Sequence, residues 1–278
     1  MSSIALNSIK GSLNVITGCG SGLGKSTLQW FLRRGCGPTL GIDKHFEDDF
    51  IKSLELNEEE EKQLIIKQHD TFDSEKTESS LEEFTSKHGS IHNLINVAGV
   101  SLAFTMYTAN KASSYDLKHA KDLVEFNTVG TFNMIRSASR YMVDSKSSKQ
   151  DTRSRCIVNA SCISTTKPSI GQTFYAGSKA AIDSLTLCTA RDLSRYNIRC
   201  NTINVGYFDT KLLQASEEKI CQYITSEIML CPSRLGHPDE FAHLVQTIVE
   251  NSMINGACIR IDGCAETVLD KQHHRPLT

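Results

Sequence analysis

The sequence lacks several features that would point to particular classes of protein. Its 30 basic residues nearly balance its 32 acidic ones and the pI is about 6.5, so no overall charge favours nucleic acid or an acidic membrane. No apolar run approaches the length of a transmembrane helix. The ten cysteines include no Cys-x-x-Cys pair, which argues against a thiolate metal site or a disulfide scaffold. Reduced thiols in an intracellular protein are the simpler interpretation.

The sequence also shows no internal repeat and no linker, which favours one domain over residues 1–278. Short apolar runs alternate with longer amphipathic ones, a pattern typical of an α/β protein with a parallel sheet. We expect seven strands, at about 12–16, 38–42, 64–68, 91–96, 156–160, 199–204 and 257–261. The clearest helices are expected at about 22–34, 74–88, 119–143, 174–195 and 238–250.

The stretch "ITGCGSGLGKST" (16–27) has the look of a phosphate-binding loop. A P-loop NTPase would need glycine five positions before Gly24, where this chain has Cys19. The dinucleotide pattern G-x-G-x-x-G fails as well, because Leu23 stands in place of the third glycine. The spacing that fits is T-G-x-x-x-G-x-G, at Thr17, Gly18, Gly22 and Gly24. Between a strand and a helix, such a turn places the helix N-terminus against a pyrophosphate.

Acidic residues follow the second and third expected strands. Asp43 could bond both ribose hydroxyls and would repel a 2′-phosphate, which predicts NAD as the cofactor. Lys44, next to it, is expected to point to the other face of the strand end. Asp70 is placed to face the adenine, and the small residues of "INVAG" (95–99) let backbone approach a ligand closely.

Tyr175 and Lys179 are the strongest catalytic candidates. Their spacing of four puts both side chains on one face of a helix. A tyrosine normally titrates near pH 10. A lysine ammonium about 4 Å away contributes on the order of 4 kcal/mol at an effective dielectric near 20, or roughly three pKa units. We therefore expect Lys179 to lower the pKa of the Tyr175 phenol into a useful range for acid–base chemistry.

Taken together, "TGCGSGLG", Asp43, "NVAG", Asn127 in "FNTVGTFN" and "YAGSK" resemble the short-chain dehydrogenase/reductase family over nearly the whole chain. The resemblance implies a single Rossmann-type domain with a doubly wound, parallel, seven-stranded sheet. Three more stretches narrow it to one branch of the family: "ARDLSRYNIRCNTI", "PSRLGHPDEFAHLVQTIVEN" and "NGACIRIDG". That branch is mitochondrial, NAD-dependent, homotetrameric and broad in substrate.

The resemblance also assigns roles to residues. Tyr175 and Lys179 match the catalytic pair, Asn127 the residue that holds a proton-relay water, and residues from about 206 to 232 a substrate lid. The residues that match cofactor contacts, together with the glycine fingerprint, are Gly18, Ser21, Gly22, Leu23, Gly24, Asp43, Asp70, Thr71, Val97, Tyr175, Lys179, Phe208 and Thr210. No metal ligand is implied.

Two departures from the family pattern bear on activity. The proline-glycine after the sixth strand reads Val205-Gly206, which predicts a less rigid loop over the nicotinamide. The serine that binds the substrate oxygen lies thirteen residues before the tyrosine in this family, and here that position holds Cys162. A local shift could bring in Ser161 or Ser164 instead, although the gapless match of "NASCIS…IGQTFY" argues against a shift of one residue.

The leading expectation is an NAD-dependent dehydrogenase of 3-hydroxyacyl-CoA or hydroxysteroid-type secondary alcohols. The alternative is a weakly active or inactive NAD-binding scaffold of mitochondrial RNase P, beside a tRNA methyltransferase, because a branch member also serves there in animals. Mitochondrial localisation rests on the resemblance, since the acid-free N-terminus "MSSIALNSIKGSLN" has only one basic residue, Lys10. A homotetramer is expected from pairing of the helices at 119–143 and 174–195.

Overall fold

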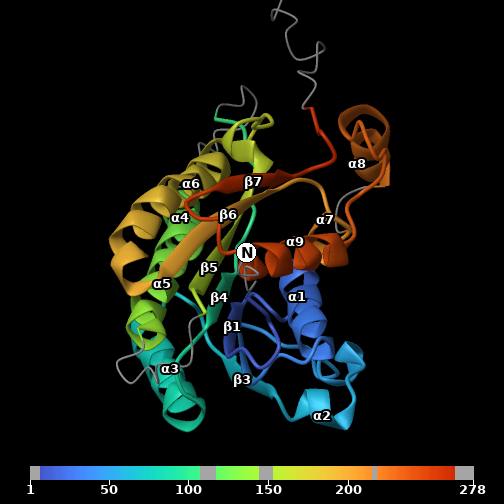
Figure 1. Ribbon diagram of the computed structural model, residues 1–278. Coiled ribbons are helices and arrows are strands. Elements are labelled where there is room, and N and C mark those ends of the chain that lie inside the picture. The colour runs from blue at the N-terminus through green and yellow to red at the C-terminus, as the bar shows by residue number, and fades with distance from the viewer. Residues whose placement is uncertain (1–6, 107–116, 144–152, 215–217, 267–278) are drawn as a thin grey trace, which may run out of the picture.

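The computed structural model describes residues 7–106, 117–143, 153–214 and 218–266, and these form one α/β domain (Figure 1). All seven strands are parallel, in the order β3-β2-β1-β4-β5-β6-β7. The strands are β1 (Asn14–Thr17), β2 (Thr39–Asp43), β3 (Leu64–Gln68), β4 (Asn93–Asn96), β5 (Arg155–Cys162), β6 (Ile198–Val205) and β7 (Cys258–Ile261). The predicted doubly wound, seven-stranded Rossmann-type sheet is confirmed, with shifts of a few residues at strand ends.

Helices cover both faces of the sheet (Figure 1). They are α1 (Gly22–Arg33), α2 (Glu58–Glu61), α3 (Ser74–His88), α4 (Leu117–Val124), α5 (Gly130–Met142), α6 (Thr173–Leu193), α7 (Lys211–Gln214), α8 (Glu218–Tyr223) and α9 (Pro238–Glu250). Helices α1 and α9 pack together on one face, and α3, α5 and α6 contribute to the core on the other. Adjacent Val15 and Ile16 of β1 enter opposite cores, because successive side chains of a strand alternate.

The helix expected over 119–143 is present, and helical residues run without a break from Leu117 to Met142. A π-helical turn at Glu125–Val129, which the sequence did not predict, lies between α4 and α5. The wide turn presents Asn127, which is fully buried, towards the loop after β4. π-turns within helices often lie at functional sites.

The expected lid at 206–232 contains α7, α8 and a second π-turn at Ile224–Ile228. Its apolar residues Ile224 and Ile228 belong to a small core of their own with Ile163 and Ala265. Parts of two sequence-based predictions lie outside the described residues: positions 215–217 of the lid and the first six residues of the N-terminus. Among the described helices, none is both long and apolar enough to cross a bilayer.

Candidate active site

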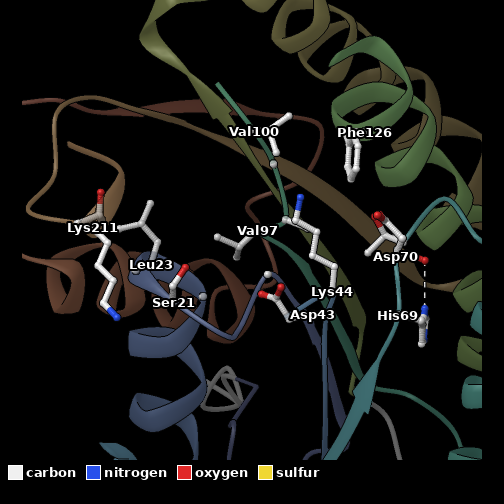
Figure 2. Close-up of a pocket in the computed structure, with 17 residues that line it drawn as sticks. Ser21, Leu23, Asp43, Lys44, His69, Asp70, Val97, Val100, Phe126 and Lys211 are labelled. Atoms are coloured by element: carbon white, nitrogen blue, oxygen red, sulfur yellow. Dashed lines mark hydrogen bonds between the residues drawn. The ribbon is translucent and has the colours of Figure 1, made fainter. Parts of the chain in front are cut away.

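The principal pocket lies where the strand order reverses, beyond the carboxyl ends of β1 and β4 (Figure 2). Open α/β sheets bind their ligands at such a switch point. Gly18 follows β1 with a φ of +70°, and a Cβ at this position would lie 2.5 Å from the Ala98 nitrogen. A Cβ on Gly24 would overlap the Gly18 carbonyl oxygen. Glycine is therefore required for the turn to approach both β4 and α1.

The first turn of α1 forms one wall of this pocket. Ser21, Gly22, Leu23 and Gly24 line it, and Val97 lies across from them (Figure 2). The unpaired N–H groups and positive dipole end of a helix stabilise an anion. No acidic side chain stands in the first turn of α1 to oppose that charge. The predicted glycine fingerprint thus has a geometry that fits the pyrophosphate of a dinucleotide.

Asp43, at the end of β2, faces the same pocket. One carboxylate oxygen accepts a hydrogen bond from the Gly20 N–H at 2.9 Å, and the other accepts from the His45 N–H at 3.2 Å. These bonds hold the carboxylate in place and leave each oxygen a further lone pair. Asp43 can therefore still accept from ribose hydroxyls.

The prediction for Lys44 is wrong. Its side chain lines the pocket instead of the opposite face, and Figure 2 shows it between Asp43 and Asp70. The ammonium lies 4.6 Å from the centroid of the Phe126 ring, a cation–π distance. The reason is that β2 ends at Asp43, so strand alternation no longer governs the next residue. The Lys44 ammonium beside Asp43 therefore also bears on whether the pocket prefers NAD or NADP.

Asp70 and Thr71 line the other end of the pocket, after β3. Burial raises the pKa of the Asp70 carboxyl, while the Lys44 ammonium opposes that shift. The Thr71 carbonyl accepts a hydrogen bond from Asn133 Nδ2 at 2.8 Å, and Asn133 is buried in α5. The predicted adenine-binding loop is thus anchored to a helix.

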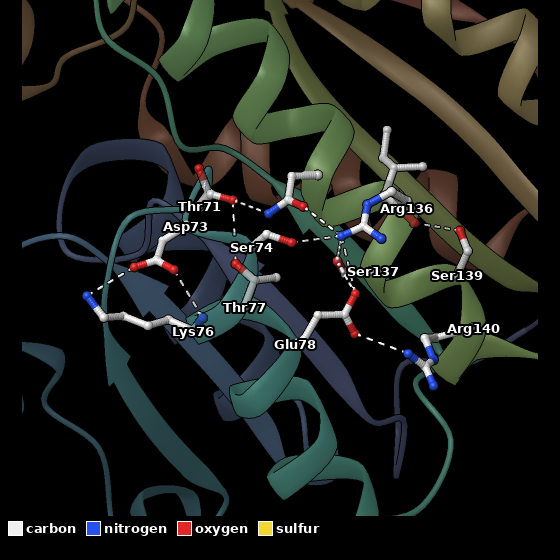
Figure 3. A network of polar contacts seen from close by, with 12 residues as sticks. Thr71, Asp73, Ser74, Lys76, Thr77, Glu78, Arg136, Ser137, Ser139 and Arg140 are labelled. Carbon is white, nitrogen blue, oxygen red and sulfur yellow. Dashed lines mark hydrogen bonds and ion pairs between the residues drawn. The ribbon is translucent and has the colours of Figure 1, made fainter.

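A polar network extends this anchor across α3 and α5 (Figure 3). Arg136 donates to Asn133 Oδ1 at 3.1 Å and to Ser74 Oγ at 2.9 Å, and it pairs with Glu78 at 3.3 Å. Arg140 pairs with the same carboxylate at 3.5 Å. Exposed ion pairs of this kind add little stability singly, but the buried Asn133 link positions Thr71.

Ala98 and Gly99 line the pocket, as the small residues of "INVAG" predicted. Several other lining residues were not predicted: Lys44, His69, Val100, Phe126 and Lys211. Phe126 directly precedes Asn127 and so had a sequence signal. Lys211 lies beside Leu23 at the wall formed by α1 (Figure 2), and its ammonium pairs with Glu47 at 2.5 Å. Its side chain had no such signal, because the contact joins residues 164 positions apart.

Tyr175 and Lys179 lie on α6, as their spacing predicts. Lys179 is buried, and its ammonium donates to the Ala160 carbonyl at 3.1 Å. Burial lowers the pKa of Lys179 because the charged form loses solvation. A Cβ on Gly99 would lie 3.0 Å from Lys179 Nζ and 3.2 Å from Asn127 Oδ1, so this glycine brings both groups close to the pocket.

The lowered pKa expected for the Tyr175 phenol is a wrong prediction for this structure. Burial raises that pKa well above its ordinary value, and the hydrogen bond to the Cys162 side chain raises it further. The Lys179 ammonium donates instead to a backbone carbonyl. Loss of solvation therefore outweighs the attraction that the helical spacing alone suggested.

Asn127 spans the gap between the π-turn and the loop after β4. Its side chain exchanges two hydrogen bonds with the backbone of Val100, both at 2.9 Å, and donates to Ser178 Oγ at 3.0 Å. The structure thus brings Asn127 beside Lys179 through their shared neighbour, Gly99. Its predicted role in holding a relay water stays a prediction.

Cys162, at the end of β5, lies against the Tyr175 hydroxyl. Its sulfur also accepts from the Ser164 N–H at 3.4 Å. Ser161 is buried and donates its hydroxyl to the Lys179 backbone carbonyl at 3.1 Å, so the alternative that placed it beside the tyrosine is corrected. Ser164 Oγ is buried without a hydrogen-bond partner among the described residues, which leaves that alternative open.

The loop after β6 differs from expectation in one respect. Val205 pairs with both Cys162 and Ile261, and the Gly206 N–H donates to the Ile261 carbonyl at 3.0 Å. Strand pairing therefore holds the start of this loop, and the lower rigidity predicted without proline stays a prediction. Thr210 lines the pocket as predicted, whereas the ring of Phe208 is buried against Gly236 and does not line it.

These features define a class: a Rossmann-type dinucleotide-binding protein in which a half-buried tyrosine and a buried lysine share one helix, with the lysine beside the candidate cofactor pocket. The model of the short chain dehydrogenase family matches residues 13–220. The chain belongs to the short-chain dehydrogenase family. It is an oxidoreductase, and family membership implies a nicotinamide dinucleotide as cofactor.

Particular relatives are similar over nearly the whole chain. The 3-hydroxyacyl-CoA dehydrogenase type-2 of Drosophila melanogaster is 34% identical over 255 residues, or 92% of this chain and 97% of that protein. The protein of the same name from Homo sapiens is 33% identical over 259 residues, or 93% and 97%. A crystal structure of 3-hydroxyacyl-CoA dehydrogenase type-2 from Mycobacterium avium superposes with a TM-score of 0.81 at 25% identity, covering 93% and 97%.

Proposed function

We propose that the protein is an NAD-dependent dehydrogenase of 3-hydroxyacyl-CoA or hydroxysteroid-type secondary alcohols. The observation that carries this proposal is the Tyr175–Lys179 pair on α6, whose lysine ammonium lies beside Gly99 of the pocket that Asp43 also lines. The names of the similar relatives support the acyl-CoA substrate.

In this proposal Tyr175 takes the proton of the substrate hydroxyl as the carbon gives up hydride. The bound nicotinamide supplies the hydride acceptor. Lys179 holds the ribose through its ammonium, and Asn127 links that lysine to water. Reduction of the corresponding ketone runs these roles backwards, with the Tyr175 phenol donating its proton to the carbonyl oxygen.

A second candidate function is favoured by Cys162. A thiol is a weak hydrogen-bond donor, so a cysteine beside the tyrosine supports a weakly active or inactive NAD-binding scaffold. For this alternative we propose an RNase P complex in mitochondria, beside a tRNA methyltransferase. We propose a mitochondrial location for the protein under either candidate function.

Turnover of acetoacetyl-CoA with NADH, measured beside NADH binding by fluorescence, separates the two. We expect both binding and turnover. Binding without turnover would select the scaffold. If the protein neither binds NADH nor turns over acetoacetyl-CoA, both the dehydrogenase and the scaffold proposals are contradicted. Turnover with NADPH but not with NADH would contradict the choice of NAD as the cofactor.

For the cofactor, we expect NADH to bind at least about tenfold more tightly than NADPH, because Asp43 repels a 2′-phosphate. Asp43→Ala should reduce the difference in affinity between NADH and NADPH. Lys44→Ala should widen it, since its ammonium is a cation that a 2′-phosphate could use. The test is to measure the dissociation constants of NADH and NADPH for the unmodified protein, Asp43→Ala and Lys44→Ala. Equal affinities of the unmodified protein for the two cofactors would contradict a preference for NAD.

For assembly, we propose a homotetramer that pairs helices from the 119–143 and 174–195 regions. Large apolar side chains are about half exposed there: Val129 (47%), Phe132 (49%) and Leu187 (46%). Light scattering at micromolar concentration should give four times the chain mass, and Phe132→Asp should lower it. Ile51→Asp, an exposed apolar control after β2, should not. A monomeric mass for the unmodified protein would refute the proposal.

A further inference from the structure

A half-buried acid, Asp183, lies one helical turn beyond Lys179 on α6. Tyr175, Lys179 and Asp183 are each four residues apart, so their side chains follow one stripe of the helix. The first two have roles in the proposed reaction, whereas Asp183 has none. Its surroundings show that it is more than an exposed helix residue.

The Asp183 carboxylate is held by the strand that follows α6. One oxygen, Oδ2, accepts a hydrogen bond from Asn204 Nδ2 at 2.6 Å. Asn204 is 4% exposed, and the same nitrogen donates to Thr165 Oγ1 at 3.0 Å and to the Cys162 carbonyl at 3.5 Å. The carboxylate is therefore fixed relative to the end of β5, where the candidate catalytic cysteine lies.

The second carboxylate oxygen is left without compensation by hydrogen bonds. Asp183 Oδ1 is buried and has no hydrogen-bond partner among the described residues. Burying a carboxylate is costly unless an opposite charge lies near it. The Lys179 ammonium is likewise buried, and it donates to the neutral Ala160 carbonyl. These two side chains, one turn apart, are complementary charges.

The electrostatics of neighbouring groups agree with this pairing. Burial lowers the pKa of Lys179, and the charges of Cys162 and, after it, Asp183 act against that shift. The titratable groups that act on Lys179 are Cys162 from β5 and Asp183 from α6. The Cys258 sulfur of β7 donates to the backbone carbonyl of Asp183 at 3.7 Å, and the charge of Asp183 helps to raise the pKa of that thiol, after burial.

We propose that Asp183 is a positioning residue that holds Lys179 in its charged form, so that the tyrosine–lysine pair of this chain works as a Tyr-x-x-x-Lys-x-x-x-Asp unit. The inference rests on the proposed function in one respect, the contact of the Lys179 ammonium with the cofactor ribose. An uncharged lysine would bind the ribose hydroxyls less well.

The test is the pH dependence of cofactor binding in Asp183→Asn. Dissociation constants are measured by fluorescence from neutral to alkaline pH, with NADH or NADPH, whichever binds the unmodified protein more tightly. Without the aspartate charge, Lys179 should lose its proton at lower pH. We expect the pH at which affinity falls to drop by about one unit, the size of effect that a nearby opposite charge produces. Asp183→Glu should restore most of the shift.

Asp192→Asn removes an exposed carboxylate from the same helix and should leave that pH unchanged. An unchanged pH for Asp183→Asn would overturn the inference. So would an equal loss of affinity at every pH, since that outcome indicates a structural role alone. If the unmodified protein fails to turn over substrate while the shift is still present, the proposed reaction fails and the inference about Asp183 stands.

Discussion

Cys162→Ser is expected to raise kcat about 100-fold, with little change in cofactor affinity. A serine hydroxyl donates a good hydrogen bond to the substrate oxygen, whereas a thiol is larger and a weak donor. A well-aligned donor to a developing oxyanion contributes about 3–4 kcal/mol to the transition state, a factor of 10²–10³. The structure places this sulfur against the Tyr175 hydroxyl, where the exchange acts directly on the candidate acid–base group.

Steady-state kinetics with acetoacetyl-CoA and fluorescence titration with NADH measure the two effects separately. Cofactor affinity should hold because Cys162 does not line the dinucleotide pocket. Cys231→Ser, an exposed cysteine, is the matched control and should not change kcat. If Cys162→Ser is no faster and Ser164→Ala abolishes turnover, Ser164 supplies the hydroxyl and the expectation for Cys162 is wrong.

Tyr175→Phe is expected to lower kcat by about 10³-fold, within the range that a positioned acid–base group contributes. The substitution removes the hydroxyl and keeps the ring, so NADH binding should survive. Single-turnover kinetics together with NADH titration make the measurement. Tyr196→Phe, on an exposed tyrosine just after α6, should leave kcat unchanged. Undiminished turnover in Tyr175→Phe would remove the tyrosine from the proposed mechanism.

The raised pKa of the Tyr175 phenol adds a dependence on pH. A raised pKa favours the neutral phenol, which is the form that donates a proton during ketone reduction. Alcohol oxidation needs the phenolate, so its rate should climb with pH through the alkaline range, while reduction persists into that range. Cys162→Ser should shift both profiles to lower pH, because the cysteine is one cause of the raised pKa.

Local sequence patterns were sufficient to predict the glycine turn, the strands of the sheet and the shared helix face of Tyr175 and Lys179. The T-G-x-x-x-G-x-G spacing predicted the turn between β1 and α1, because only glycine fits where backbone meets backbone at Gly18 and Gly24. The alternation of short apolar runs with longer amphipathic ones predicted seven parallel strands. Strands of a parallel sheet are buried on both faces, and their sequences are therefore apolar without interruption. The four-residue step predicted that Tyr175 and Lys179 share a helix face.

Other properties depend on which segments meet in space, and only the tertiary structure decided them. Lys44 lies in the pocket because β2 stops one residue earlier. The Tyr175 phenol keeps its proton because packing removes it from water, an effect that helical spacing cannot express. Asp183 is held by Asn204, twenty-one residues away, and that bond exists only once β6 lies beside β5. The burial of a side chain and its contacts with distant residues depend on how the whole chain packs. A short stretch of sequence therefore cannot predict them.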